Sequence, residues 1–236
     1  MHSNTYTIFF TSIMTIILGI ILSTVSGKLK ATQEEQVEND SKKNILISLG
    51  YVEPFDNPWT STDIKNIFER NIETYLLDTL GNRKEKNTKS KDNDEEIRSL
   101  PLYLKKENGK IGGYAIPISG KGLWSTLYGY FAIEPDGSTV KGITFYKHKE
   151  TPGLGGEVDK HWFQNNFIGK KFVDPENNLV GIKVLKGKVD PNNKTAYHQV
   201  DGISGATITS KGLENFLLND LKKYDLFFQK IRDRQG

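Results

Sequence analysis

The sequence predicts an α+β protein in which one apolar N-terminal helix precedes a domain with a mixed or antiparallel sheet and flanking helices. Three observations predict this class. Ile8–Val25 is apolar and free of charge, and at about 1.5 Å per residue it is long enough to cross the hydrocarbon layer of a bilayer. Short strand-like runs separated by glycine begin at Pro101, and a helical pattern closes the chain. Strands and helices do not alternate regularly, which favours α+β over a doubly wound parallel sheet.

The apolar run has two interpretations, an uncleaved transmembrane anchor or a cleaved signal peptide. Ser23–Gly27 supplies small residues at which a peptidase could cut. However, no Lys or Arg precedes the run, and the run is long for a signal peptide. We therefore assign residues 1–27 to a single transmembrane anchor. One helix cannot form a pore by itself, so any transport function requires partner subunits.

Residues 28–100 are predicted to form a helical connecting region. The helix that leaves the membrane should continue until Gly50, where glycine favours a helix end. Residues 82–98 contain almost only polar and charged side chains, so we expect them to form a solvated excursion.

A second helix is predicted within this region, over Asp63–Leu80. Its apolar residues recur at spacings of three and four, which would give it one buried face. Either Ser61 or Thr62 is suited to cap its N-terminus, and Gly81 to end it.

Residues 101–236 should form the domain that contains the sheet. Two hairpins are predicted, one around Glu107-Asn108-Gly109 and the other around Pro135-Asp136-Gly137, because each turn sequence lies between two apolar runs. The other predicted elements are a short helix, a strand and a terminal helix with apolar residues at helical spacing: Asp159–Phe167, Leu179–Leu185 and about Lys211–Ile231.

The composition excludes several classes of function. The 236 residues include 32 Lys and Arg against 29 Asp and Glu, a net charge of +3, and there is no concentrated basic face of the kind that binds nucleic acid. The absence of cysteine excludes disulfides, thiolate metal ligands and a cysteine nucleophile. No metal site is expected, because the four histidines form no recognisable metal-binding pair: His2, His148, His161 and His198.

The segment Asp201–Ser210, DGISGATITS, has the residue types of an anion-binding helix start. Gly202 and Gly205 allow the backbone to bend and to approach a ligand closely. The N–H groups and the positive dipole end of the following helix suit a phosphate. The spacing differs from the phosphate loop G-x-x-x-x-G-K-[ST], so nucleotide hydrolysis is not indicated.

The alternative for this segment is an ordinary capped helix start. In that case Thr209 or Ser210 is the N-cap and the hydroxyl groups have no ligand. Residue types alone favour this alternative.

The heptapeptide Asp201–Thr207 resembles the flavinylation motif, in which a dedicated transferase attaches FMN to the last threonine through a phosphoester. The resemblance implies that Thr207 Oγ1 holds the flavin phosphate. It also implies that Asp201 belongs to the pattern that the transferase recognises. The residues between them that are then expected beside the cofactor are Ser204, Gly205 and Ala206.

A second unusual stretch is His148–Gly156, HKETPGLGG. Pro152 and Gly153 suit the two central positions of a type II turn. Together with Gly120–Ser125 (GKGLWS) and the flavinylation motif, in this order, the stretch resembles the C-subunit family of sodium-translocating NADH:quinone reductases.

The family resemblance covers nearly the whole chain and implies contacts with the isoalloxazine ring of the flavin. The residues implied are Trp124 and four members of the turn: Glu150, Thr151, Gly153 and Leu154. Nearby backbone N–H groups would stabilise the reduced, anionic flavin. Two alternatives remain open: Trp124 is a core residue beside Leu123 and Leu127, and His148 and Glu150 only hold the turn. We assign no acid–base role to either, because electron transfer between bound cofactors does not require a positioned proton donor.

The resemblance implies an FMN-carrying electron-transfer subunit of a complex that oxidises NADH, reduces ubiquinone and exports sodium. Its expected partners are the other membrane subunits and, during maturation, the flavin transferase. The chain has no G-x-G-x-x-G fingerprint for NADH and no acidic residue in the apolar run, so both steps belong to partners. One alternative is the corresponding subunit of an Rnf-type electron-transport complex, which the Gly-Leu-Trp-Ser segment disfavours. Another is a tethered ectodomain that binds a partner without redox chemistry.

Two arguments disagree about the topology in the membrane. Four lysines follow the anchor closely, and the positive-inside rule then favours a cytoplasmic domain: Lys28, Lys30, Lys42 and Lys43. The family resemblance implies a bacterial inner-membrane protein with its flavin domain on the periplasmic face. We favour the family orientation, because subunits of one complex share their orientation and partner helices can override a weak charge bias.

Overall fold

The computed structural model describes residues 4–84 and 99–234. The chain divides into two compact units, residues 1–40 and 41–236, and the described residues of the first unit belong to helix α1 (Asn4–Ser48). Its segment Asn4–Lys30 is long and apolar enough to cross a membrane, with a mean hydropathy of 2.3, and none of it is buried within the protein. The hydroxyl groups of Thr11, Thr15 and Thr24 donate to carbonyl groups four residues earlier, so their polar atoms are satisfied within the helix.

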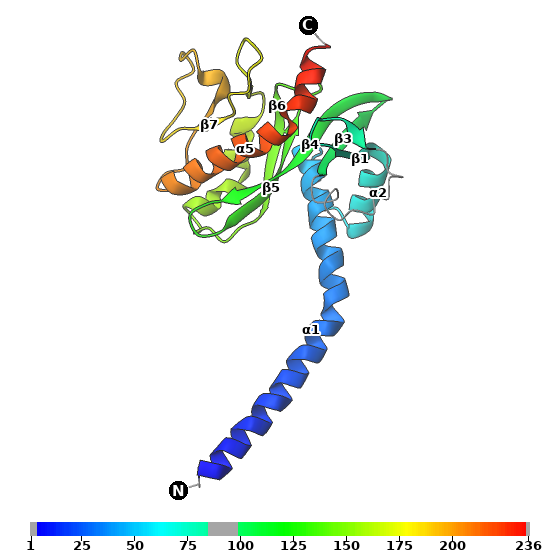
Figure 1. Cartoon of the computed structure of the whole chain (residues 1–236), viewed down its shortest axis with the longest axis vertical. Helices are drawn as coiled ribbons and strands as arrows, with labels where there is room; N and C mark the ends of the chain where they lie inside the picture. The colour runs from blue at the N-terminus through cyan, green and yellow to red at the C-terminus, as the bar shows by residue number, and fades with distance from the viewer. Residues whose placement is uncertain (1–3, 85–98, 235–236) are drawn as a thin grey trace. The chain divides into compact units, whose positions relative to one another are not determined.

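The second unit is built on a six-stranded sheet with the strand order β2-β1-β3-β4-β5-β6 (Figure 1). Neighbouring strands are antiparallel throughout, as the α+β prediction expected. The strands are β1 (Ile72–Leu77), β2 (Arg83–Lys84), β3 (Leu100–Glu107), β4 (Lys110–Lys121), β5 (Thr126–Ile133) and β6 (Val140–Lys147). A separate parallel pair consists of β7 (Lys183–Val184) and β8 (Gln199–Val200).

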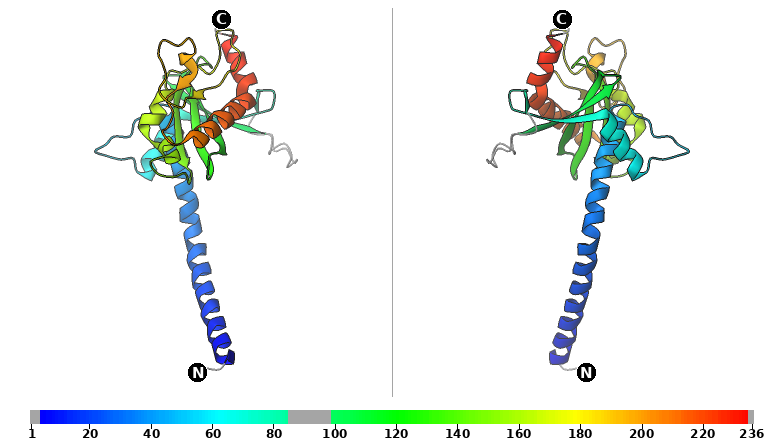
Figure 2. Two further views of the ribbon diagram at one scale, coloured as in Figure 1. Left: turned by 90° about the vertical axis from the view of Figure 1, so that its left-hand side faces the viewer. Right: turned by 90° about the vertical axis from the view of Figure 1, so that its right-hand side faces the viewer.

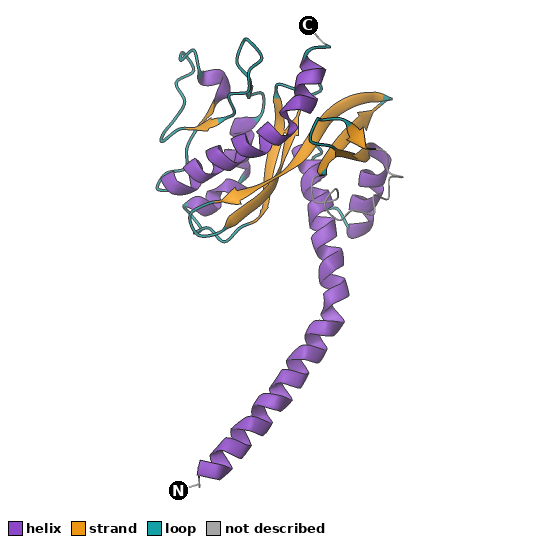
Figure 3. Cartoon of the chain, viewed as in Figure 1, coloured by secondary structure: helices purple, strands orange, loops and turns teal. Residues whose placement is uncertain are grey.

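Helices cover both faces of this sheet (Figure 2). Helix α5 (Thr207–Arg232) buries its apolar stripe on one face, where Leu213, Leu217 and Leu221 join the larger core. On the other face, helix α2 (Ser61–Asn71) and the end of α1 share a smaller core with β4 and β5. The short segments η1 (Gly155–Asp159), α4 (His161–Gln164), η2 (Asn165–Phe167) and η3 (Ala196–His198) lie in the connections (Figure 3).

Both predicted hairpins are confirmed. The turn between β3 and β4 has positive φ at Asn108 (50°) and Gly109 (77°), the conformation that an Asn-Gly pair favours in two-residue hairpins. In the turn between β5 and β6, the Asp136 carboxylate accepts hydrogen bonds from the N–H groups of Ser138 and Thr139, both at 2.9 Å. The short helix predicted over Asp159–Phe167 is present as α4 followed by η2.

The predicted helix Asp63–Leu80 is wrong in its second half. Helix α2 ends at Asn71 and the chain continues directly as strand β1, which pairs with β3 from Ile72↔Lys105 to Leu77↔Leu100. Residues 72–77 are rich in β-branched and aromatic side chains, and pairing with β3 outweighs their helical spacing. The cap is Thr60 rather than Ser61 or Thr62, and Thr60 forms a reciprocal capping box with Asp63.

Two further boundaries differ from the prediction. The strand expected over Leu179–Leu185 is reduced to β7, with Leu179 forming only an isolated bridge to Val173. Within the expected charged excursion, Arg83–Lys84 forms strand β2, whereas residues 85–98 lie outside the described residues.

Candidate functional site at the start of helix α5

Helix α5 begins at Thr207, four residues before the predicted start, with Ala206 as its N-cap. No side chain caps this end, and the first intrahelical hydrogen bond joins the Ser210 N–H group to the Ala206 carbonyl oxygen at 2.9 Å. The N–H groups of residues 207–209 therefore precede the helical ladder and point out of the helix start. The expectation that Thr209 or Ser210 is the cap is wrong, since both lie inside the helix.

The hydroxyl groups of this segment have different environments. Thr207 and Ser204 are exposed. Thr209 is buried, and its Oγ1 donates to Glu150 Oε2 at 2.7 Å. Ser210 is 5% exposed, and its Oγ has no hydrogen-bond partner within the described part of the chain. Thr207 is thus the exposed hydroxyl group at the helix start itself.

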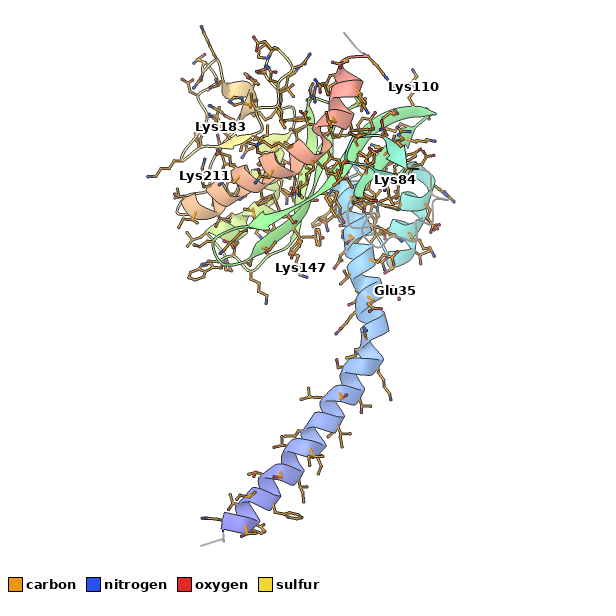
Figure 4. All side chains as sticks on the ribbon, viewed as in Figure 1. Glu35, Lys84, Lys110, Lys147, Lys183 and Lys211 are labelled. Atoms are coloured by element: carbon orange, nitrogen blue, oxygen red, sulfur yellow. The ribbon has the colours of Figure 1, made fainter. Side chains whose placement is uncertain are left out.

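A small cavity of about 80 Å³ opens beside Thr207. Its lining residues are Thr207, Ser210, Lys211, Lys186, Val184, Leu185 and Ile203. The side chains of Lys186 and Lys211 are exposed at its rim, and Figure 4 shows Lys211 on α5 and Lys183 on the neighbouring β7. Two lysines and a helix N-terminus together suit a phosphate group.

Asp201 and Gly202 fix the loop that leads to the helix. Asp201 Oδ1 accepts a hydrogen bond from the Val189 N–H group at 2.8 Å, and the Gly202 N–H group donates to the Gly187 carbonyl oxygen at 2.9 Å. A Cβ atom at Gly202 would lie 1.8 Å from the carbonyl oxygen of Leu185. The motif therefore needs glycine at this position for close packing against the 185–189 loop.

The predicted turn at Pro152-Gly153 is present. The Leu154 N–H group donates to the Thr151 carbonyl oxygen at 3.1 Å, and Gly153 has φ 75°, as a type II turn requires at its third residue. Residues 151–154 are exposed. A Cβ atom at Gly205 would lie 2.7 Å from Leu154 Cδ2, so this turn and the DGISGAT motif are in direct contact.

Trp124 lies in the connection between β4 and β5 and is 71% exposed. The alternative that Trp124 is a core residue is therefore wrong, although Leu127 is fully buried. Other exposed apolar side chains lie in the same connection, in the Pro152-Gly153 turn and in the first turn of α5: Leu123, Leu154 and Ile208. Such side chains are available to cover a flat apolar ligand.

Glu150 lies beneath these segments and is only 6% exposed. Burial alone raises the pKa of its carboxyl group, but hydrogen bonds from the Thr209 hydroxyl and from the N–H groups of residues 123–125 outweigh burial and hold that pKa below its usual value. The carboxylate is therefore ionised at neutral pH. Its oxygen atoms face protein donors rather than the surface.

The structure brings together the residues that the sequence singled out from three distant stretches. Sequence reasoning missed Lys186, which lies on a loop with no recognisable motif. It also missed the hydrogen bond between Thr209 and Glu150 and the lack of a hydrogen-bond partner for Ser210 Oγ, because both depend on tertiary packing. Among residues 4–84 and 99–234, no group of three or more His, Asp or Glu side chains is arranged to hold a metal ion.

Comparisons with known proteins agree with this geometry. Residues 122–222, which include Gly122–Ser125 and the whole of the His148–Gly156 and Asp201–Ser210 segments, match the FMN-binding domain family. The chain is 34% identical to the C subunit of the Na(+)-translocating NADH-quinone reductase of Pseudomonas aeruginosa, over 98% of this chain and 97% of that protein. It is 36% identical to the C subunit of the same reductase from Pasteurella multocida, over 86% of this chain and 84% of that protein. The crystal structure of the C subunit from Parabacteroides distasonis matches with a TM-score of 0.69 at 31% identity, covering 85% of this chain and 96% of that one.

Proposed function

Because the chain belongs to the C-subunit family of the sodium-translocating NADH-quinone reductase, we propose that it holds FMN covalently, through a phosphoester to Thr207. As a member of this family, the chain is an FMN-carrying electron-transfer subunit of the reductase complex and acts together with the other membrane subunits. The names of its full-length relatives favour this reductase over an Rnf-type complex. The FMN-binding domain disfavours a tethered domain without redox chemistry.

The observation that carries the proposal is the position of Thr207 on the surface, at the first residue of α5 and in the wall of the 80 Å³ cavity. Thr209 and Ser210 are buried, so neither hydroxyl group is accessible for modification. A phosphoryl group on Thr207 would face the N–H groups of the helix start and the lysines at positions 186 and 211. These groups would neutralise its charge.

FMN, when bound, supplies the electron-accepting and electron-donating chemistry of this subunit. We assign the ring contact to the exposed side chains of Trp124 and Leu154, which would exclude water from the ring. The remaining residues that we assign to the rim of the site are Thr151, Gly153, Ser204, Gly205 and Ala206. We do not assign Glu150 to the ring contact, since its carboxylate already accepts hydrogen bonds from five protein donors.

Maturation requires a flavin transferase, and we assign Asp201 to the pattern that the transferase recognises. Asp201 also accepts the Val189 N–H group, so its carboxylate holds the motif in shape while remaining partly exposed. Substitution of Asp201 would thus affect the fold of the loop as well as recognition.

The proposal is tested by producing the full chain with its native flavin transferase, denaturing it and recording a visible spectrum and gel fluorescence. Flavin that remains with the denatured chain supports a covalent bond. Flavin that separates from the chain on denaturation contradicts the phosphoester, while leaving FMN binding itself in place.

Gly153→Val tests the role of the turn. A Cβ atom at Gly153 meets no atom within 4 Å, yet its φ of 75° strains any β-branched residue. The turn should therefore change conformation at a cost of about 1–2 kcal/mol, and Thr207 should still be modified. We expect a flavinylated variant with a changed reduction potential and slower electron transfer in the complex. A wild-type potential and turnover would show that the turn does not shape the flavin site.

The orientation in the membrane follows from the proposed complex, and we infer a single-pass inner-membrane protein with its flavin domain on the periplasmic face. A cysteine is a specific probe because the chain contains none. In the variant Lys194→Cys, whose cysteine lies at an exposed loop position, a membrane-impermeant maleimide should label this cysteine in intact spheroplasts. Labelling only after the inner membrane is broken would place the domain in the cytoplasm, as the positive-inside rule suggests.

A further inference from the structure

The carboxylate of Glu150 connects the three segments that form the proposed flavin site. Its Oε1 accepts hydrogen bonds from the N–H groups of Trp124 at 2.9 Å and Ser125 at 3.0 Å. Its Oε2 accepts from the Leu123 N–H group at 3.2 Å and from Thr209 Oγ1 at 2.7 Å. One side chain thus joins the Trp124 loop to the first turn of α5, and its own backbone leads into the Pro152-Gly153 turn.

The packing around this carboxylate leaves no room for another group. A Cβ atom at Gly122 would lie 2.7 Å from Glu150 Oε1, and one at Gly155 would lie 2.8 Å from Glu150 Oε2 and 2.6 Å from Thr209 Oγ1. Glycine at these two positions lets the backbone of both loops close over the carboxylate. The Glu150 carboxylate is thus closely packed between the two loops and largely shielded from solvent.

The charge of Glu150 is compensated by N–H groups rather than by a basic side chain. Three successive N–H groups form a concave anion-binding arrangement. Within the described part of the chain, no Lys, Arg or His forms an ion pair with this carboxylate. The backbone of Glu150 is also held, since its N–H group donates to His148 Nδ1 at 3.3 Å. A second bond at the same place joins the Lys149 N–H group to Ser125 Oγ at 2.7 Å.

We propose that Glu150 is a positioning residue that fixes Trp124, the Pro152-Gly153 turn and Thr207 relative to one another before any flavin is attached. That these segments hold flavin rests on the proposed function, whereas the hydrogen bonds of the carboxylate are independent of it. Thr209 is the second positioning residue, since its hydroxyl group donates a hydrogen bond to the carboxylate from the helix that also contains Thr207. Glu150 neither contacts the flavin nor transfers a proton.

Glu150→Gln separates the charge of the side chain from its size. The amide keeps one acceptor oxygen but presents an N–H₂ group where the carboxylate had its second oxygen. That group then faces either the N–H groups of the Trp124 loop or the Thr209 hydroxyl. At least one of the connected segments loses its acceptor.

The first measurement is amide hydrogen exchange of the full-length chain in detergent, produced without the transferase so that no flavin is present. In Glu150→Gln, the amides of residues 123–125 should exchange about tenfold faster than in the wild type, since a lost hydrogen bond to a charged group corresponds to roughly that factor. The matched control is Glu69→Gln on the exposed face of α2, which should exchange like the wild type. Unchanged exchange in Glu150→Gln would overturn the proposal.

The second measurement is the reduction potential of flavin attached to the same variants. Glu150→Gln and Thr209→Val should both accept flavin and both show a shifted potential, while Thr209→Ser, which keeps the hydroxyl group, should restore the wild-type value. Faster exchange with an unchanged potential would show a merely structural role and overturn the positioning proposal. Absence of flavin from the wild-type chain would instead contradict the proposed function, and the exchange measurement would still test the carboxylate.

Discussion

Thr207→Val should abolish covalent flavin attachment completely. Valine matches the shape of threonine but has no hydroxyl oxygen to form the phosphoester. Thr207 is exposed at the first residue of α5, so the substitution removes no buried contact, and the domain should keep its wild-type thermal stability to within about 0.5 kcal/mol. Gel fluorescence after denaturation measures the attachment, and thermal unfolding checks the fold.

Two variants locate the bond within the motif. Ser204→Ala removes the other exposed hydroxyl group of the loop and should retain flavin. Thr209→Val should also retain it, at a stability cost of about 1.5–3 kcal/mol because Glu150 loses a donor to its charged carboxylate. Flavin that persists in Thr207→Val, or disappears only from Ser204→Ala or Thr209→Val, would contradict attachment at Thr207.

The parts of the fold that could be predicted from the sequence are those set by local chemistry. Asn108-Gly109 and Pro135-Asp136-Gly137 lie in the two predicted hairpins, because positive φ and aspartate-capped turns depend on the residues in the turn itself. The Pro152-Gly153 turn is predictable for the same reason. In each case the deciding interactions span only a few residues.

Residues 72–77 show where local chemistry is not sufficient. Their apolar side chains fit both a helical stripe and a strand, and the deciding partner is β3, whose pairing residues begin at Leu100. The segment preceding β3 in sequence is charged and contains no pattern that predicts the pairing of β1 with β3. Pairing of this kind depends on tertiary context, which propensity does not contain.

The hydroxyl groups of the flavin motif were ambiguous for a related reason. A serine or threonine just before an apolar helix pattern predicts an N-cap, yet Thr209 donates its hydroxyl to a carboxylate that is 59 residues away in sequence. Its role depends on the β4–β5 connection, which brings residues 123–125 under the helix start. The motif could therefore be found from the sequence, but which of its hydroxyl groups is exposed and which is hydrogen-bonded to Glu150 could not.

Gly202→Ala should have the largest effect on stability among single-methyl substitutions in the motif. The added Cβ atom would lie 1.8 Å from the carbonyl oxygen of Leu185 and 2.9 Å from its carbonyl carbon, and backbone atoms cannot rotate away as a side chain does. Overpacking usually costs about 1–3 kcal/mol, and we expect a loss of about 3 kcal/mol in the free energy of unfolding here. Because the loop must move to relieve the contact, the motif should also lose the shape that the transferase recognises, and flavin attachment should fall sharply.

Gly187→Ala is the matched control for this prediction. Gly187 accepts the Gly202 N–H group through its carbonyl oxygen, so both glycines lie in the same backbone contact. A Cβ atom at Gly187 would meet no atom within 4 Å, and this variant should retain both stability and flavin. Chemical unfolding of the two variants in detergent, with gel fluorescence beside it, separates close packing from a general intolerance of this loop to substitution. Equal losses in both variants, or wild-type behaviour of Gly202→Ala, would show that the contact between Gly202 and Leu185 does not hold the motif in place.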